Sequence, residues 1–87
     1  MAIIWIPPLL QDLTGGRQRL DVPGETLRDV IAVLEQEYPG ISARLVEDGR
    51  IRSGVAVVVD GVVSHTRMRH RLSDSSEVHF LPALSGG

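Results

Sequence analysis

Two glycines at the end of the chain, Gly86 and Gly87, are the residues best placed to do chemistry. They follow Ser85 and an apolar run over residues 78–84. Glycine has no Cβ and has unusually free φ and ψ angles, so a tail of this kind can straighten and enter a channel that admits only backbone. The ending therefore predicts a reactive tail, and the alternative is a terminus with no chemical role.

The chemistry open to Gly87 is activation of its carboxylate. A terminal carboxylate is ionised at neutral pH and is a poor electrophile. An enzyme that transfers AMP from ATP onto this group would supply a good leaving group. A sulfur donor could then displace AMP and leave a thiocarboxylate on Gly87.

Other residues offer weaker candidates for a site. His65 and His70 could pair with an aspartate, either Asp60 or Asp74. No strand–turn–helix context presents a serine nucleophile to them, and their spacing is not that of a helical zinc pair. We therefore expect surface histidines and no metal site. The glycine pair at 15–16 has no following lysine and predicts a turn rather than a phosphate loop.

The composition describes one domain, residues 1–87, with a net charge of −2 and neither cysteine nor lysine. Disulfides and thiol chemistry are therefore excluded, and no lysine side chain of the same molecule can accept an activated Gly87. The charge gives no case for nucleic acid or a membrane as partner, so the basic run at 67–71 predicts a solvated loop. We expect a cytoplasmic protein, since no signal segment or membrane-length apolar run is seen.

A lone tryptophan, Trp5, admits two interpretations. On a central strand it usually belongs to the core. If Ile4 and Ile6 face a helix, however, Trp5 and Ile3 lie on the opposite face of the sheet. An uncovered apolar face there would mark a partner site.

The hydrophobic pattern predicts several strands and one main helix. Strands are expected at 2–6, 17–22, 55–59, 62–63 and 77–81, a short helix at 8–13 and a further helical turn at 41–46. Thr26 is the expected cap of the main helix, with Asp29 as its capping-box partner. The helix should bury a stripe formed by Leu27, Val30, Ile31, Leu34 and Tyr38.

This order of elements predicts an α+β fold, in which one main helix packs on a mixed sheet of about five strands. The first and last strands can lie side by side in the middle of the sheet. That arrangement is the β-grasp, or ubiquitin-like, fold. Pairing of the last strand should end near Pro82, which has no N–H to donate.

The chain also resembles a known family, the MoaD/ThiS sulfur carriers. The resemblance covers essentially the whole chain and rests on Ile6-Pro7-Pro8-Leu9-Leu10, Leu13-Thr14-Gly15-Gly16, Gly24-Glu25-Thr26-Leu27, Tyr38-Pro39-Gly40-Ile41 and Leu81-Pro82-Ala83-Leu84-Ser85-Gly86-Gly87. It implies a β-grasp fold and adenylation of Gly87 by a ubiquitin-activating-type enzyme. A thiocarboxylate on Gly87 would then donate sulfur.

The resemblance also implies roles for the tail and its partners. Gly87 would carry the adenylate and the thiocarboxylate, and a flexible tail over 83–87 would reach the partner enzyme. The residues expected to contact that partner are Leu81, Pro82, Ala83, Leu84, Ser85 and Gly86. The chain would be a protein cosubstrate, or the small subunit of a synthase. It would bind no cofactor itself, because ATP is used by the activating enzyme.

Two branches of the family and one other class of function stay open. The segments at 13–16, 38–42 and 81–83 are most similar to the CysO-like carriers, which deliver sulfur for cysteine synthesis to a synthase and work with a zinc metalloprotease. The molybdopterin synthase small subunits usually have two prolines before the tail, where this chain has Pro82 and Ala83. The alternative is a ubiquitin-like protein modifier or an interaction module without sulfur chemistry.

Overall fold

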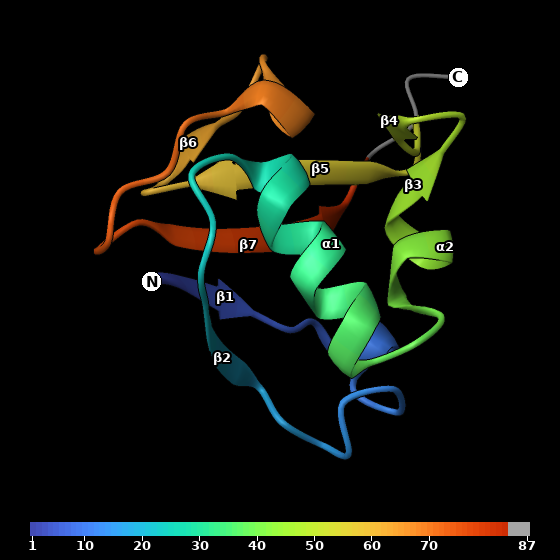
Figure 1. The fold of residues 1–87 in the computed structure, drawn as a ribbon. Helices are drawn as coiled ribbons and strands as arrows, with labels where there is room; N and C mark the ends of the chain where they lie inside the picture. The colour runs from blue at the N-terminus through green and yellow to red at the C-terminus, as the bar shows by residue number, and fades with distance from the viewer. Residues whose placement is uncertain (84–87) are drawn as a thin grey trace.

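The computed structural model describes residues 1–83 and has helices packed on one face of a mixed sheet (Figure 1). The main sheet contains β1 (Ala2–Trp5), β2 (Arg19–Val22), β5 (Val55–Val59), β6 (Val62–Val63) and β7 (Glu77–Pro82). The predicted reactive tail, residues Leu84, Ser85, Gly86 and Gly87, lies outside the described residues.

The two strands farthest apart in the sequence lie side by side at the centre of the sheet. The strand order is β2-β1-β7-β5-β6, in which β1 and β7 are parallel and the other neighbours are antiparallel. In the middle of this sheet Ile4 lies between Leu20 and Val78, and all three side chains are buried. The predicted β-grasp fold is therefore confirmed.

The main helix, α1 (Leu27–Glu37), begins at the predicted cap. The Asp29 N–H donates to the Thr26 hydroxyl at 3.3 Å, and the Thr26 N–H donates to the Asp29 carboxylate at 3.2 Å. This capping box satisfies two N–H groups that the first turn leaves without helical partners. The predicted stripe packs on the sheet, since Leu27, Val30, Ile31 and Leu34 are buried and Tyr38 is half-buried.

A short helix and a small hairpin follow α1, and the sequence predicted only the helix. The expected helical turn is α2 (Ile41–Leu45), and it leads into a small hairpin formed by β3 (Val46–Glu47) and β4 (Arg50–Ile51). This hairpin was not predicted, because strands of two residues have no periodicity. The Asp48-Gly49 turn was the available signal, and both residues have positive φ angles, 54° and 75°.

Two short 3-10 helices complete the described chain. The first, η1 (Pro8–Leu10), is shorter than the predicted helix over 8–13 and is followed by turns that end at Gly15 and Gly16, both with positive φ. The second, η2 (Arg67–Arg69), lies where an exposed loop was expected. In residues 1–83, no helix is long and apolar enough to cross a membrane.

Candidate functional site

The central strand β7 holds the chain in the sheet as far as Ala83. Pro82 lies opposite Val55, and the next N–H, that of Ala83, donates to the Gly54 carbonyl at 2.9 Å. The Val55 N–H donates to the Arg52 carbonyl rather than to Pro82. Val55 and Pro82 are therefore a pair without hydrogen bonds between them, and the sheet needs no N–H from Pro82 at this position. Pairing therefore extends one residue beyond the predicted end, and Leu81, Pro82 and Ala83 form the base of the tail.

An apolar groove of ≈ 670 Å³ lies beside this base. Its floor includes the buried side chains of Leu10, Leu45 and Phe80. Leu9, which is 79% exposed, and Leu81, which is 46% exposed, stand at its rim. The groove therefore joins η1, α2 and the end of β7 into one apolar surface.

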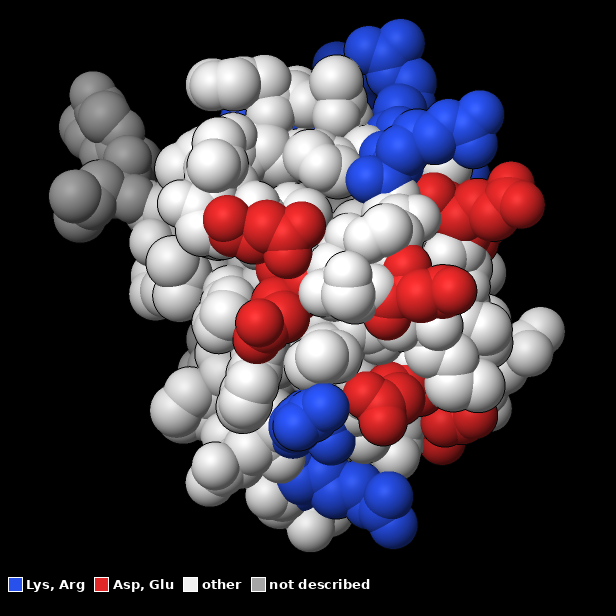
Figure 2. Space-filling model, turned by 90° about the vertical axis from the view of Figure 1, so that its left-hand side faces the viewer, with Lys and Arg blue, Asp and Glu red and all other residues white. Residues whose placement is uncertain are grey.

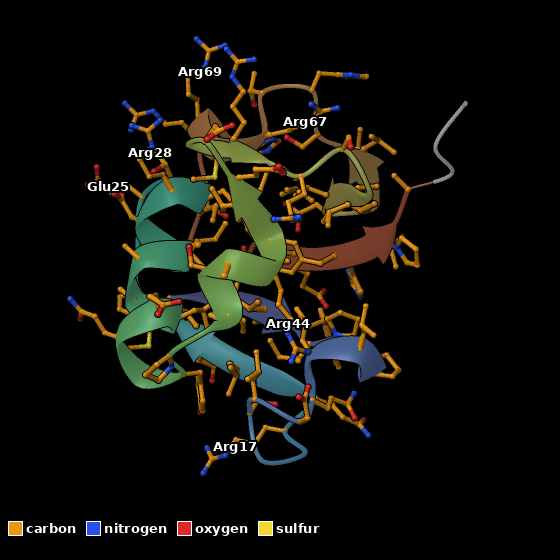
Figure 3. The ribbon with its side chains drawn as sticks, turned by 90° about the vertical axis from the view of Figure 1, so that its right-hand side faces the viewer. Arg17, Glu25, Arg28, Arg44, Arg67 and Arg69 are labelled. Atoms are coloured by element: carbon orange, nitrogen blue, oxygen red, sulfur yellow. The ribbon has the colours of Figure 1, made fainter. Side chains whose placement is uncertain are left out.

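Among residues 1–83, Arg44 is the one charged residue that lines the groove, and it connects α2 to the segment after β1. Its two terminal nitrogens donate to the two carboxylate oxygens of Asp12, each at 3.1 Å. One of these nitrogens also donates to the Leu9 carbonyl at 3.0 Å. Figure 3 shows Arg44 reaching from α2 toward η1. This bidentate geometry holds the backbone that carries Leu9 in a defined position.

The sequence alone did not identify Leu9, Asp12 or Arg44 as residues of the candidate site. The Asp12 and Arg44 side chains meet across 32 positions of the chain, and neither residue belongs to a local motif. The proline pair at 7–8 was a partial signal, because it predicted a break after β1 and hence an exposed connection.

Trp5 lies on the face of the sheet opposite α1, so its interpretation as a core residue is wrong. Its ring stacks on His79, with centroids 5.7 Å apart and planes 8° apart. Its indole N–H donates to the Glu77 carboxylate at 2.9 Å, and the Arg19 guanidinium carbon lies 5.9 Å from the ring centroid. The alternation of β1 causes this placement, because Ile4 points into the core and Trp5 points away from it.

The histidine–aspartate pairs that the sequence left possible are not formed among the described residues, and these side chains make other contacts. The Nδ1 atom of His70 lies 2.7 Å from the hydroxyl of buried Ser64, and His65 is exposed. The Asp60 carboxylate accepts the Glu77 N–H at 2.8 Å, and Asp74 contacts the terminal ammonium group at 3.1 Å. Within residues 1–83, no group of three or more metal-ligating side chains is present.

The charged surface is mixed in sign. Figure 2 shows arginines near two ends of one face, with acidic side chains between them. Arg67 and Arg69 are exposed, as a solvated segment requires. Arg71 lies 3.9 Å from Glu25, and both side chains are at least 80% exposed, so this ion pair adds little stability.

Comparison with known proteins assigns this fold and its tail to a family. The sequence pattern of the ThiS family matches residues 4–87, which span most of the chain. The chain belongs to the ThiS family. Membership confirms the resemblance found in the sequence, and it covers the groove, the central strand and the terminal glycines.

Two proteins that are similar in sequence to this chain have names that describe a function. The chain is 34% identical to the sulfur carrier protein CysO of Mycobacterium tuberculosis, over 94% of each chain. It is 39% identical to small archaeal modifier protein 3 of Haloferax volcanii, over 71% of this chain and 70% of that protein. The chain is therefore similar both to proteins named as sulfur carriers and to a protein named as a modifier.

A solved structure gives the same fold. In the crystal structure of the Amycolatopsis orientalis BexX/CysO complex, the matching chain has a TM-score of 0.91 and 27% identity. The match covers 100% of both chains. The ubiquitin-like architecture is therefore shown for the part of the chain that the structure describes, residues 1–83.

Proposed function

We propose that the protein is a sulfur carrier that acts through Gly87. The observation that carries this proposal is the relationship to CysO over nearly the whole chain, and it is supported by this chain's own ending, in which Gly86 and Gly87 follow the central strand in sequence. The sheet holds the base of the tail at Ala83, and four residues then separate that base from the reactive carboxylate.

The proposed chemistry has two steps. First, a carboxylate oxygen of Gly87 attacks the α-phosphorus of ATP, and the bond to pyrophosphate breaks to release pyrophosphate. This step gives an acyl-adenylate. Next, hydrosulfide attacks the acyl carbon, the bond to AMP breaks, and AMP leaves with the electron pair. Loss of the thiol proton gives a thiocarboxylate, and no oxidant or reductant is required when sulfide is the donor.

In this proposal the chain is a protein cosubstrate and the activating enzyme supplies the catalytic groups. That enzyme binds ATP, and the carrier binds no cofactor of its own. Leu81, Pro82 and Ala83 would meet the enzyme at the end of the sheet, and Leu84, Ser85 and Gly86 would lie along its channel. A narrow channel favours the terminal glycines because a Cβ would widen the chain.

Relationship to CysO supports cysteine synthesis as the destination of the sulfur. The partner after activation would then be a sulfur-accepting synthase, with a zinc metalloprotease to release the product. Molybdopterin synthesis is the second destination, in which the chain would be the small subunit of a synthase. The existence of a BexX/CysO complex supports recognition of such carriers by a protein partner.

Protein modification is a second candidate function, and the relative named small archaeal modifier protein 3 favours it. An activated Gly87 would in that case acylate an amine on another protein. The chain has no lysine, so its own side chains offer no competing amine. The two functions share the adenylation step and differ in whether sulfur or the entire chain reaches the acceptor.

Intact-mass measurement tests the proposal. The protein is incubated with the adenylating enzyme of its source organism, ATP and sulfide. We expect a gain equal to the mass difference between sulfur and oxygen, localised to Gly87 by fragmentation. If the enzyme is active on another carrier but leaves this mass unchanged, the sulfur-carrier proposal is wrong, and attachment to other proteins would then favour a modifier.

A further inference from the structure

We propose that three arginines, one in the first turn of α1 and two on η2, form a binding surface for an acidic segment of a partner protein. Arg28, Arg67 and Arg69 make up this arginine patch. None of them lines the groove beside the tail. The patch is therefore a second surface of the molecule, and the inference goes beyond the proposed function and does not depend on it.

The patch is assembled from two elements that the fold brings together. The η2 helix packs against α1, and the Leu27 N–H donates to the His70 carbonyl at 3.0 Å where the two elements meet. Between the two arginines of η2, Met68 is half-buried against the core and anchors the helix, which leaves both arginines exposed. Figure 3 shows the three arginines of the patch at one end of the molecule. The fold therefore concentrates positive charge at this end.

The guanidinium groups of the patch are available to a partner. In the part of the chain that the structure describes, none of the three forms an ion pair, although four other arginines do. All three patch residues are exposed. A guanidinium group can bind a carboxylate through two parallel hydrogen bonds, so the patch has the chemistry to hold several carboxylates at once.

The backbone of Arg67 is held in a strained conformation. Its φ angle is 48°, in the left-handed region that a residue with a long side chain rarely adopts. Its N–H donates to the hydroxyl of buried Ser64 at 2.9 Å, and that hydroxyl lies 2.7 Å from Nδ1 of His70. Its carbonyl accepts the His70 N–H at 2.8 Å. Contacts on both sides thus fix an unfavourable backbone beneath an exposed guanidinium group, and strain of this kind clusters at functional sites.

Acidic side chains beside the patch favour a short segment as its occupant. Glu25 and Asp29 are exposed around the start of α1, and Figure 2 shows acidic side chains next to the arginines. A nucleic acid or an anionic membrane would extend its charge over these carboxylates, and the net charge of −2 adds to the repulsion. A flexible acidic segment can place its carboxylates on the three guanidinium groups and then turn away from the surface.

NMR titration with a short oligoglutamate peptide tests the patch, because each arginine Nε–H gives its own signal. We expect the signals of Arg28, Arg67 and Arg69 to shift at low ionic strength. Arg69→Gln should raise the Kd for the peptide about threefold or more. Arg17→Gln is the matched control and should leave the Kd within about 1.5-fold of the wild type. Arg17 is exposed, has no ion pair within residues 1–83 and lies at the opposite end of the molecule (Figure 3). Thermal melts confirm that both variants fold.

Three results would overturn the proposal. Arginine signals that do not move with the peptide would show that the patch does not bind acidic segments. Equal Kd values for Arg69→Gln and Arg17→Gln would mean that net charge alone governs binding. Tighter binding of duplex DNA or of phosphatidylglycerol vesicles at the same ionic strength would assign the patch to one of those partners instead.

Arg67→Gly tests the strained backbone separately. Glycine adopts a positive φ angle freely, so the melting temperature should stay the same or rise. The Kd for the peptide should still rise about threefold, because a guanidinium group is lost. Unchanged binding would overturn the assignment of Arg67 to the patch, and a lower melting temperature would overturn the argument from strain.

Discussion

The two ends of the sheet both expose apolar side chains, but their surroundings differ. At the groove end, Leu9 and Leu81 stand over a buried floor beside the base of the tail. At the β5–β6 end, Val62 and Val63 are 68% and 54% exposed on an edge strand of two residues. Exposure alone therefore does not mark a site. The continuity of the groove with the tail distinguishes the first end from the second.

The ion pairs near the two ends differ in the same way. Arg44 binds Asp12 through two parallel contacts of 3.1 Å and also reaches the Leu9 carbonyl. Arg71 makes one contact of 3.9 Å with Glu25. The first pair joins segments that form the groove, whereas the second lies on a solvated surface. Variants can test whether this structural difference is also a functional one.

The largest expected effect comes from the core, on which both ends depend. Leu34→Ala removes a fully buried side chain of α1 and should lower the free energy of unfolding by about 2–5 kcal/mol. Chemical denaturation measures this loss. The comparison predicts that both ends remain usable while the variant is folded, so activation well below its melting temperature should stay near the wild-type rate. A selective loss of activation in fully folded protein would contradict that view.

The next effect should be confined to the tail. Gly87→Ala adds a Cβ at the reactive carboxylate, and a displacement of the reacting group can lower the rate by about 100-fold. The melting temperature should not change, because β7 ends before this position. Pyrophosphate exchange and a thermal melt measure the two properties. An unchanged exchange rate would contradict the narrow channel and with it the tail mechanism.

The smallest effect separates the two ion pairs. Arg44→Ala frees the segment that carries Leu9, and we expect a KM for the carrier about three- to tenfold higher, with a small loss of stability. Arg71→Ala is the matched control and should leave both values unchanged. Equal effects of the two substitutions would mean that Arg44 acts through net charge rather than by positioning Leu9.

Local patterns were sufficient to predict most elements. The capping pair Thr26 and Asp29, the stripe of α1 and the turn between β5 and β6 are all encoded within a few residues, and all are present. The apolar character of the first strand predicted its central position, and the order of elements allowed the last strand to lie beside it, as the sheet shows. Errors arose where the pattern was short, as in the β3–β4 hairpin, or where alternation left two faces possible, as for Trp5.

The sequence by itself determined the β-grasp order of elements, the family and the glycines proposed to react, because each depends on local spacing or on residues in a fixed order. Only the tertiary structure decided what surrounds the base of the tail. Leu9, Arg44 and Leu81 come from three separate parts of the chain, and their proximity depends on how η1, α2 and β7 pack. Such packing depends on the combined shape of many side chains, which no short stretch of sequence contains.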